Sequence, residues 1–224
     1  MGRLELLNGA NTVAIKSSAG NWELIQFESA EEIDADTWQL STLLRGQLGT
    51  IDAALAGANA GAVFVLIDQA VTPAGLSAME VGLERNWRIG PSGFEITEAN
   101  FVEATMTGGV RSRLPLSPVH LQASRNGSGD LLITWVRRTR IGGDDWQQSE
   151  VPLGEQIEEY QVEIAPAGGS TIRTATTATA DWLYGAAEIS VDFAVLPVEI
   201  DITIRQRSIA AGWGIPASRR FTLF

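Results

Sequence analysis

The sequence has no cysteine, one lysine (Lys16) and one histidine (His120) among its 224 residues. Without cysteine the chain has no disulfide, no thiolate zinc site and no cysteine nucleophile. With one histidine, a histidine-based metal site and a catalytic triad both lack their parts. We therefore expect His120 to be an ordinary surface residue, and we predict no metal, no cofactor and no catalytic residue.

Long apolar runs are also missing, and none approaches the roughly 20 residues that a membrane-spanning helix needs. The first four residues are followed by Glu5 in place of an apolar core, so no signal peptide is visible. We predict no membrane insertion. Because the N-terminus begins almost inside a strand pattern, we expect the chain to be a piece of a longer polypeptide.

Positive charge is scarce, since 16 Lys and Arg residues face 27 Asp and Glu residues and the net charge is -11. Binding to a phosphate backbone depends on cationic side chains that release counterions. We therefore expect no nucleic acid partner. All basic residues except Lys16 are arginines, which suit fixed, bidentate contacts, although genomic base composition explains this bias equally well.

Helical periodicity is rare, and short alternating segments recur between turns rich in glycine, which is typical of all-β proteins. The turn at residues 19–21 predicts a hairpin. Thr50–Leu55 is the one convincing helical turn, with Thr50 as its cap. We predict a β-rich domain over residues 1–113, with a barrel-like form left open, and strands at Leu4–Leu7, Thr12–Lys16, Trp22–Phe27, Thr37–Arg45, Ala62–Ile67, Met79–Ile89 and Phe101–Thr107.

The prolines Pro115 and Pro118 mark a change of pattern, because proline donates no hydrogen bond to a sheet. We place a domain boundary at about residue 113. Seven strand candidates follow in residues 114–224, the number expected of an immunoglobulin-like or fibronectin-like sandwich. They are Val119–Ser124, Leu131–Arg138, Tyr160–Ala165, Ser170–Ala175, Ala187–Phe193, Glu199–Arg207 and Ser218–Phe224, and the alternation at 199–205 directs Ile200, Ile202 and Ile204 to the core.

Residues 40–50, with the sequence LSTLLRGQLGT, resemble a segment of the large baseplate hub proteins of gene transfer agents and related siphophages. Residues 133–153 resemble a stretch near the C-terminal end of the same proteins, and residues 62–68 also fit. The glycine-rich end of the first segment lacks the lysine of a phosphate-binding loop, so we interpret it as a tight turn. Neither motif is catalytic.

The second half separately resembles fibronectin type III domains. Trp135 lies in its second strand, residues 160–164 open its third, and Gly212-Trp213-Gly214-Ile215-Pro216 is similar to the turn before the last strand. A long charged excursion between Arg138 and Ile157 departs from that family.

The hub resemblance implies a structural and adhesive role at the tail tip of a virion or gene-transfer-agent particle. It implies a trimer in the assembled particle, with neighbouring baseplate or tail proteins and a host surface polysaccharide as partners. It carries no enzymatic activity over to this chain. A free-standing carbohydrate-binding module that recognises a cell-surface glycan is the alternative.

The candidate binding residues are Arg137, Arg138, Arg140 and Trp146 in the excursion, together with Trp213. Two interpretations of the excursion stay open: a contact surface for a neighbouring protein or a glycan, and a self-contained loop anchored by Trp146. The adjacent carboxylates at 31–32, 144–145 and 158–159 do not form a glycosidase pair, because neighbours in a strand point to opposite faces. Among the seven tryptophans we expect Trp22, Trp38 and Trp135 in the core, and one or two of Trp87, Trp146, Trp182 and Trp213 exposed.

Overall fold

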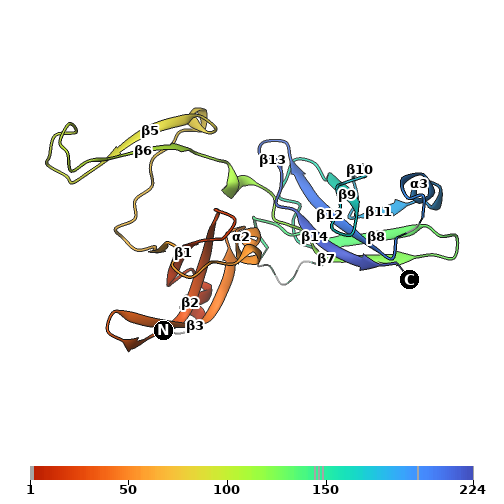
Figure 1. The fold of residues 1–224 in the computed structure, drawn as a ribbon, viewed down its shortest axis with the longest axis horizontal. Helices are drawn as coiled ribbons and strands as arrows, with labels where there is room; N and C mark the ends of the chain where they lie inside the picture. The colour runs from red at the N-terminus through yellow and green to blue at the C-terminus, as the bar shows by residue number, and fades with distance from the viewer. Residues whose placement is uncertain (1–2, 144, 146, 148, 196, 224) are drawn as a thin grey trace. The chain divides into compact units, whose positions relative to one another are not determined.

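A computed structural model describes residues 3–143, 145, 147, 149–195 and 197–223. Antiparallel sheets make up most of the ordered structure, which confirms the predicted all-β class (Figure 1). The chain divides into two compact units, one formed by Met1–Ile67 with Ser112–Phe224 and the other by Asp68–Arg111. The predicted boundary near residue 113 stays a prediction. No helix in the described part of the chain has the length and apolar content to cross a membrane.

The N-terminal sheet contains β1(Thr12–Lys16), β2(Trp22–Asp34), β3(Thr37–Gln47) and the short β4(Phe64–Leu66), in the order β3-β2-β1-β4. The predicted hairpin turn is present, with Gly20 at a left-handed φ of 82° and the Ser17 amide donating to the Asn21 carbonyl at 2.8 Å. The sheet is open, with β3 and β4 as its edges, in place of the barrel-like closure that the sequence left open.

Two helices flank this sheet, and the first corrects a prediction. The sequence pattern predicts a strand at Leu4–Leu7, but α1(Arg3–Leu7) is a helix in which only Leu6 is buried. The buried side chain of Gln26 on β2 donates to the carbonyls of Leu6 and Ala10, at 2.7 and 3.1 Å. This long-range contact satisfies carbonyl groups at the end of α1. The helical conformation of residues 3–7 therefore depends on tertiary structure.

The second helix, α2(Ile51–Ala56), lies where the helical turn is predicted, but Thr50 makes no side-chain cap. Its hydroxyl instead accepts from the Leu24 amide at 3.0 Å and donates to the Gln47 carbonyl at 2.7 Å. Thr50 therefore links α2 to the sheet.

The core of the N-terminal sheet is small. Val13, Ile25 and Phe27 are buried, with Ile15 and Leu40 packed against them. The prediction that Trp22 and Trp38 lie in the core is wrong, because their exposed fractions are 40% and 57%. Trp38 lies on the outer part of the β2–β3 hairpin, where no second layer covers the alternating pattern.

The unit Asp68–Arg111 is a two-stranded ribbon of β5(Glu84–Ile89) and β6(Val102–Thr107). Only the second half of the predicted strand Met79–Ile89 is a strand. Its start is the 3₁₀ turn η1(Ala78–Glu80), where the Glu80 carboxylate accepts from the amide and the hydroxyl of Ser77, at 2.9 and 2.8 Å. A second 3₁₀ turn, η2(Arg111–Arg113), follows the ribbon.

The C-terminal part is a sandwich of two sheets. One has the order β11-β8-β7, from β11(Asp181–Tyr184), β8(Leu131–Val136) and β7(Val119–Arg125). The other has the order β10-β9-β12-β13, with β14 also paired to β12; its strands are β9(Tyr160–Pro166), β10(Arg173–Thr177), β12(Glu199–Ser208), β13(Gly212–Trp213) and β14(Ala217–Thr222). Three strands facing four main strands, all antiparallel, is the arrangement of a fibronectin type III-like sandwich.

The sandwich core confirms the predicted alternation. Ile200, Ile202 and Ile204 have no exposed surface, and Trp135 is 4% exposed with its ring edge-on to Tyr160 at 5.1 Å between centroids. Trp182, which the sequence placed near a turn, lies on β11, stacks on Tyr184 and packs against this core.

The predicted strand Ala187–Phe193 is wrong, because these residues belong mainly to α3(Ala186–Asp192). Arg173 on β10 holds two carboxylates of this helix, Glu188 at 2.8 Å and Asp192 by a double hydrogen bond. Tyr184 also donates to Asp192, at 2.5 Å. The helix is therefore fixed by groups on neighbouring strands.

Candidate functional site

The segment that resembles the hub proteins, residues 40–50, is organised around a buried carboxylate. Glu23 on β2 has no exposed side-chain surface, and Arg45 from the segment donates to it through Nε at 2.9 Å and Nη2 at 2.6 Å. The Gly46 amide donates to the same carboxylate at 3.1 Å, and Arg45 also reaches the Ala54 carbonyl of α2 at 3.1 Å. The hydrogen bond to Glu23 raises the pKa of Arg45 above its ordinary value.

The turn that ends this segment requires left-handed backbone. Gly46, Leu48 and Gly49 have φ angles of 63°, 51° and 78°. A Cβ on Gly46 would lie 3.0 Å from the backbone of Ile51, so glycine fits by both conformation and space. The segment thus joins β3, the turn and α2 to β2.

Each arginine of the long β8–β9 connection is engaged within the chain. Arg137 donates to Glu150 at 2.9 Å, to Glu158 at 3.2 Å and to the Val151 carbonyl at 3.0 Å. Burial lowers the pKa of Arg137, but the charges of Glu158 and Glu150 outweigh burial and the net direction is upward.

Arg138 ties the start of the connection to the segment that precedes β7, and Arg140 ties the connection to itself. Arg138 donates to the carbonyl and the hydroxyl of Ser117, both at 2.8 Å, and burial lowers its pKa. Arg140 pairs with Glu155 at 2.9 Å. These contacts favour the self-contained interpretation of the connection, because an external ligand would have to compete for guanidinium groups already in use. Trp146 and Asp144 lie outside the described residues, and a binding role for this set stays a prediction.

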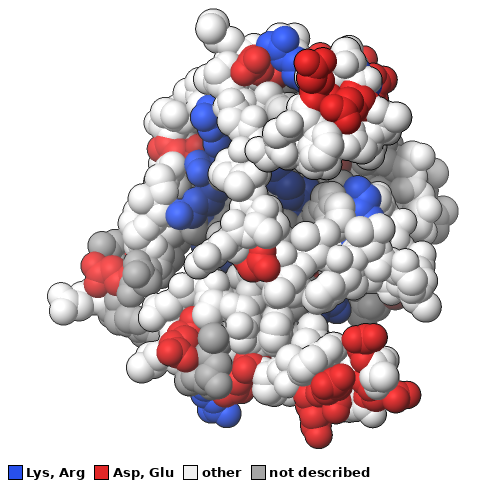
Figure 2. Space-filling model, turned by 90° about the vertical axis from the view of Figure 1, so that its left-hand side faces the viewer, with Lys and Arg blue, Asp and Glu red and all other residues white. Residues whose placement is uncertain are grey.

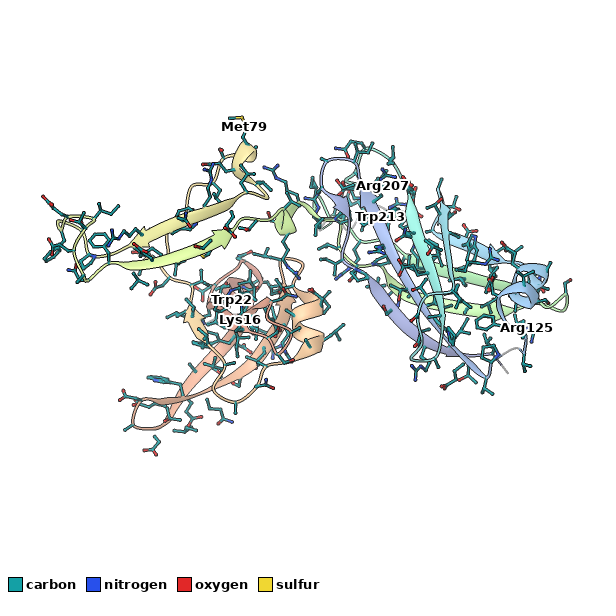
Figure 3. The ribbon with its side chains drawn as sticks, turned by 45° about the horizontal axis from the view of Figure 1, so that its top comes forward. Lys16, Trp22, Met79, Arg125, Arg207 and Trp213 are labelled. Atoms are coloured by element: carbon teal, nitrogen blue, oxygen red, sulfur yellow. The ribbon has the colours of Figure 1, made fainter. Side chains whose placement is uncertain are left out.

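Trp213 lies half-buried on β13, and Arg207 on β12 covers one face of its ring at 5.5 Å (Figure 3). Arg207 also donates to both carboxylate oxygens of Glu159 at 3.2 Å. A second such pair, Lys16 over Trp22 at 4.9 Å, lies in the N-terminal sheet. Both pairs are cation–π contacts. Trp87 and Trp182 are also half-buried, so none of the three described tryptophans expected near turns is fully exposed.

The turn around Trp213 is shaped by Gly214. Its amide donates to the Gln206 carbonyl at 2.8 Å, and a Cβ there would lie 2.6 Å from the Pro115 carbonyl oxygen. The Ile215 amide donates to that same oxygen at 3.0 Å. The glycine therefore allows the last strand to cross closely over the proline segment that enters the sandwich.

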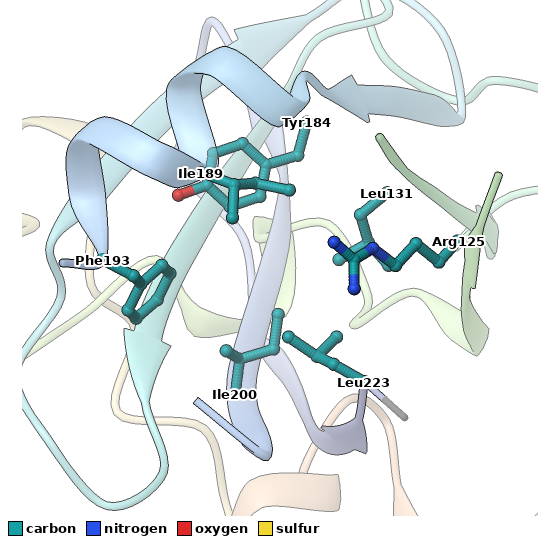
Figure 4. A pocket seen from close by; sticks show the side chains of 7 residues that line it. All are labelled: Arg125, Leu131, Tyr184, Ile189, Phe193, Ile200 and Leu223. Atoms are coloured by element: carbon teal, nitrogen blue, oxygen red, sulfur yellow. The ribbon is translucent and has the colours of Figure 1, made fainter. Parts of the chain in front are cut away.

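The interior of the sandwich offers little room for a ligand. A cavity of about 10 Å³ lies between the sheets, the space of roughly one water molecule. Its lining is mostly apolar (Figure 4) and consists of Arg125, Leu131, Tyr184, Ile189, Phe193, Ile200 and Leu223. Among the described residues, no group of three or more histidine and carboxylate side chains is placed to hold a metal ion.

The adjacent carboxylates at 158 and 159 are neutralised separately. Glu158 accepts from Arg137 and from the Tyr160 hydroxyl at 2.8 Å, whereas Glu159 pairs with Arg207. His120 is exposed at an irregularity of β7 with a φ of 53°. On the face drawn in Figure 2, acidic and basic side chains both occur among a larger number of uncharged ones.

The sequence interpretation missed Glu23, the centre of the best-defined polar cluster. A signal was present, since Glu23 lies on the same strand face as Ile25 and Phe27, at two-residue spacing. A carboxylate at an inward strand position needs a cationic partner. Nothing local identifies Arg45, which lies 22 residues away.

Together, these features define a mostly β chain whose C-terminal part is a fibronectin type III-like sandwich. A family model described as "Rcc01698-like, C-terminal" matches residues 1–65, which hold the N-terminal sheet up to the start of β4. None of the curated proteins matches the sequence.

Several solved structures are similar to this chain. Domains d3-d4 of the rat CD45 extracellular region have 12% identity, with 70% of this chain and 72% of that one covered and a TM-score of 0.35. A fibronectin type III domain from the human KIAA0970 protein has 15% identity, coverages of 50% and 76%, and a TM-score of 0.35. The FN1-FN3 domains of chicken CNTN1 have 11% identity, coverages of 95% and 55%, and a TM-score of 0.34.

Proposed function

We propose that this chain is a structural and adhesive component of a phage-like tail tip, as the C-terminal portion of a baseplate hub in a virion or gene-transfer-agent particle. The observation that carries the proposal is the coincidence of two signals. The segment 40–50 resembles hub proteins of gene transfer agents, and the matching family model covers residues 1–65 around it.

The geometry of that segment supports a structural role. Arg45 and Gly46 both bond to the buried Glu23, and Thr50 bonds to β2 and to the end of β3. These contacts tie β2, β3 and α2 together around the buried carboxylate. The fibronectin type III-like sandwich likewise has an apolar interior whose cavity would hold about one water.

The partners in this proposal are neighbouring baseplate or tail proteins, further copies of the chain in a trimer, and a host surface polysaccharide. The chain acts as a non-enzymatic module that presents loops. The β8–β9 connection, with Arg137, Arg138 and Arg140, and the turn with Trp213 are the proposed contact elements. Because these arginines already bond within the chain, recognition would use the shape of the connection more than free charge.

The experiment uses antibodies raised against the 224-residue chain and tailed particles purified from the source organism. Immunogold electron microscopy is expected to label the end of the tail distal to the capsid. Label on the capsid, or particles that contain no copy of the chain by mass spectrometry, would overturn the proposal.

A glycan array distinguishes the alternative of a free-standing carbohydrate-binding module. Saturable sugar binding that is lost in Trp213→Ala, together with the absence of the chain from particles, would favour the module. If the chain binds a glycan and is also found at the tail tip, that glycan is the host-surface partner of the proposed function.

A further inference from the structure

The β5–β6 ribbon has two faces of different chemistry. The register of the two strands places three polar cross-strand pairs on one face: Glu84 with Thr107, Asn86 with Thr105, and Arg88 with Glu103. The second pair shares a hydrogen bond of 2.9 Å, and the third a salt bridge of 3.4 Å. The other face, which we call the apolar face, carries Arg85 with Met106, Trp87 with Ala104, and Ile89 with Val102.

The apolar face is covered only in part by its own unit. The Arg85 Nε atom is buried and Leu76 lies against Gly108 at the end of β6, but most of the face stays open. The structure describes every residue of Asp68–Arg111, and none of them is buried. Ile89, Val102 and Met106 are 56%, 67% and 48% exposed. An isolated two-stranded ribbon is at best marginally stable in water and needs another layer against its apolar side. The alternating pattern of β5 and β6 therefore implies a partner surface.

We infer that the apolar face packs against the same face of a second copy of this chain. Charge is the first argument. The chain has a net charge of -11, so most faces of two copies repel each other, but the apolar face carries no carboxylate. Its one charged group, Arg85, is paired with Glu80 of η1 at 2.9 Å. Two copies that meet through this face keep the carboxylates of Glu84 and Glu103 on their outer sides.

Shape is the second argument. At the centre of the face the largest side chain, Trp87, lies directly beside the smallest, Ala104. In a two-fold dimer, if one residue of the first copy contacts a second residue of the other copy, the reverse contact is also made. Trp87 of one copy then fits over Ala104 of the other, and the reverse. A surface with a projection and a hollow side by side is complementary to itself.

The size of the face sets the strength of the association. Six side chains on each copy form an interface of roughly 1,000 Å² or less in total, which belongs to the weak or transient class. We therefore expect a dissociation constant of about micromolar or weaker, with association that depends on protein concentration. This inference concerns pairs of the free chain and uses a different contact from the trimer of the proposed function, so it can fail or succeed independently of that function.

Sedimentation equilibrium of the full chain tests the inference. The wild-type mass is expected to rise from 24.0 kDa toward twice that value as concentration increases. Val102→Lys, which puts a charge on the apolar face, is expected to stay at the monomer mass. Thr105→Lys makes the same change three positions along β6 on the polar face and is expected to behave as wild type. A wild-type mass that stays at 24.0 kDa at all concentrations, or an equal effect of the two variants, overturns the inference.

A second measurement avoids any dependence on the stability of the lysine variants. Because the chain has no cysteine, a single introduced cysteine is the one site at which two copies can be cross-linked through thiols. Ala104→Cys is expected to form a cross-linked dimer with a short bismaleimide, whereas Thr105→Cys on the opposite face is expected to form several-fold less. Equal yields at the two positions would show that the ribbons do not meet face to face.

Discussion

The carboxylate of Glu23, which has no exposed side-chain surface, accepts two hydrogen bonds from the guanidinium of Arg45 at 2.9 and 2.6 Å. The two residues lie on neighbouring antiparallel strands, and Gly46 adds a backbone donor at 3.1 Å. This arrangement satisfies a buried charge that would otherwise destabilise the sheet. Any residue except proline could supply this amide, so the glycine at position 46 follows from its left-handed φ and the nearby Ile51 backbone.

Replacing Arg45 is expected to destabilise the N-terminal sheet strongly. Arg45→Met leaves the Glu23 carboxylate buried without its charge partner, which lowers the free energy of unfolding by about 3–5 kcal/mol. Arg45→Lys keeps the charge but loses the bidentate geometry, so its effect is smaller. Urea denaturation of the full chain, followed by its total tryptophan fluorescence, measures both.

Arg3→Met is the matched control for Arg45. Arg3 pairs with Glu28 of the same sheet at 3.5 Å, but its side chain is 85% exposed. A surface pair of this kind contributes about 0–1 kcal/mol. If Arg45→Met and Arg3→Met have the same effect, the buried carboxylate does not stabilise the sheet in the way described.

Gly214→Ala is expected to weaken the sandwich because the added Cβ would lie 2.6 Å from the Pro115 carbonyl oxygen and 3.0 Å from that of Gln206. Backbone on both sides must shift, so we expect a loss of about 1–3 kcal/mol in the free energy of unfolding. Gly127→Ala is the control, since a Cβ added there would meet nothing within 4 Å and the φ of Gly127 is not left-handed. Thermal unfolding of both variants measures the difference, and an unchanged Gly214→Ala variant would contradict the close approach.

The strict alternation at residues 199–205 predicts β12 correctly because burial in the sandwich core alone produces it. In β12 every second residue enters the sandwich core, so Ile200, Ile202 and Ile204 are buried. The same rule fails at α3, where Ile189 and Phe193 also alternate with polar residues. Ile189 lies on the buried face of α3, and Phe193 follows the helix as its C-cap. Arg173 favours the helix by bonding to Glu188 and Asp192, which are four residues apart on one helix face. That selection comes from β10 and is not visible locally.

Burial is harder to predict than strand position. Trp38 alternates with neighbours as a core residue does, yet it is 57% exposed because its hairpin has no covering layer there. For the candidate site, the clustering of Arg137, Arg138 and Arg140 could be predicted from adjacency. Their partners could not be predicted. Arg137 and Arg140 pair with Glu150, Glu155 and Glu158 because the connection folds back on itself, and Arg138 bonds to the distant Ser117.

Acid is expected to destabilise the sandwich partly through Asp192. Hydrogen bonds from Arg173, with a further one from Tyr184, lower the pKa of Asp192 below its ordinary value against the opposing effect of burial. A carboxyl whose pKa is lower in the folded state stabilises the fold above its unfolded pKa of about 3.9, and that contribution is lost as the pH falls toward the folded pKa. The contribution is therefore complete at pH 7 and declines below about pH 4.

Asp192→Asn tests this contribution. At pH 7 we expect the variant to be less stable than wild type by about 2 kcal/mol, the size of hydrogen bonds to a charged group. Between pH 6 and pH 3 the difference between the two proteins should shrink, because the wild type loses what the variant already lacks. Asp181→Asn, a change of an exposed aspartate on β11, should follow the wild-type curve. A difference that does not vary with pH would contradict the assignment.

Gln206 offers a change expected to stabilise the protein. The residue is 1% exposed on β12, opposite Tyr160, and neither its amide oxygen nor its amide nitrogen has a hydrogen-bond partner among the described residues. Unsatisfied buried polar atoms are unfavourable by about 1–3 kcal/mol, and methionine has a similar volume without them. Gln206→Met is therefore expected to raise the free energy of unfolding by about 1 kcal/mol or more in urea denaturation. Gln161→Met, on neighbouring β9, should act in the opposite direction, because Gln161 accepts from Arg205 at 2.7 Å. A loss of stability in Gln206→Met would show that a bound water satisfies the amide.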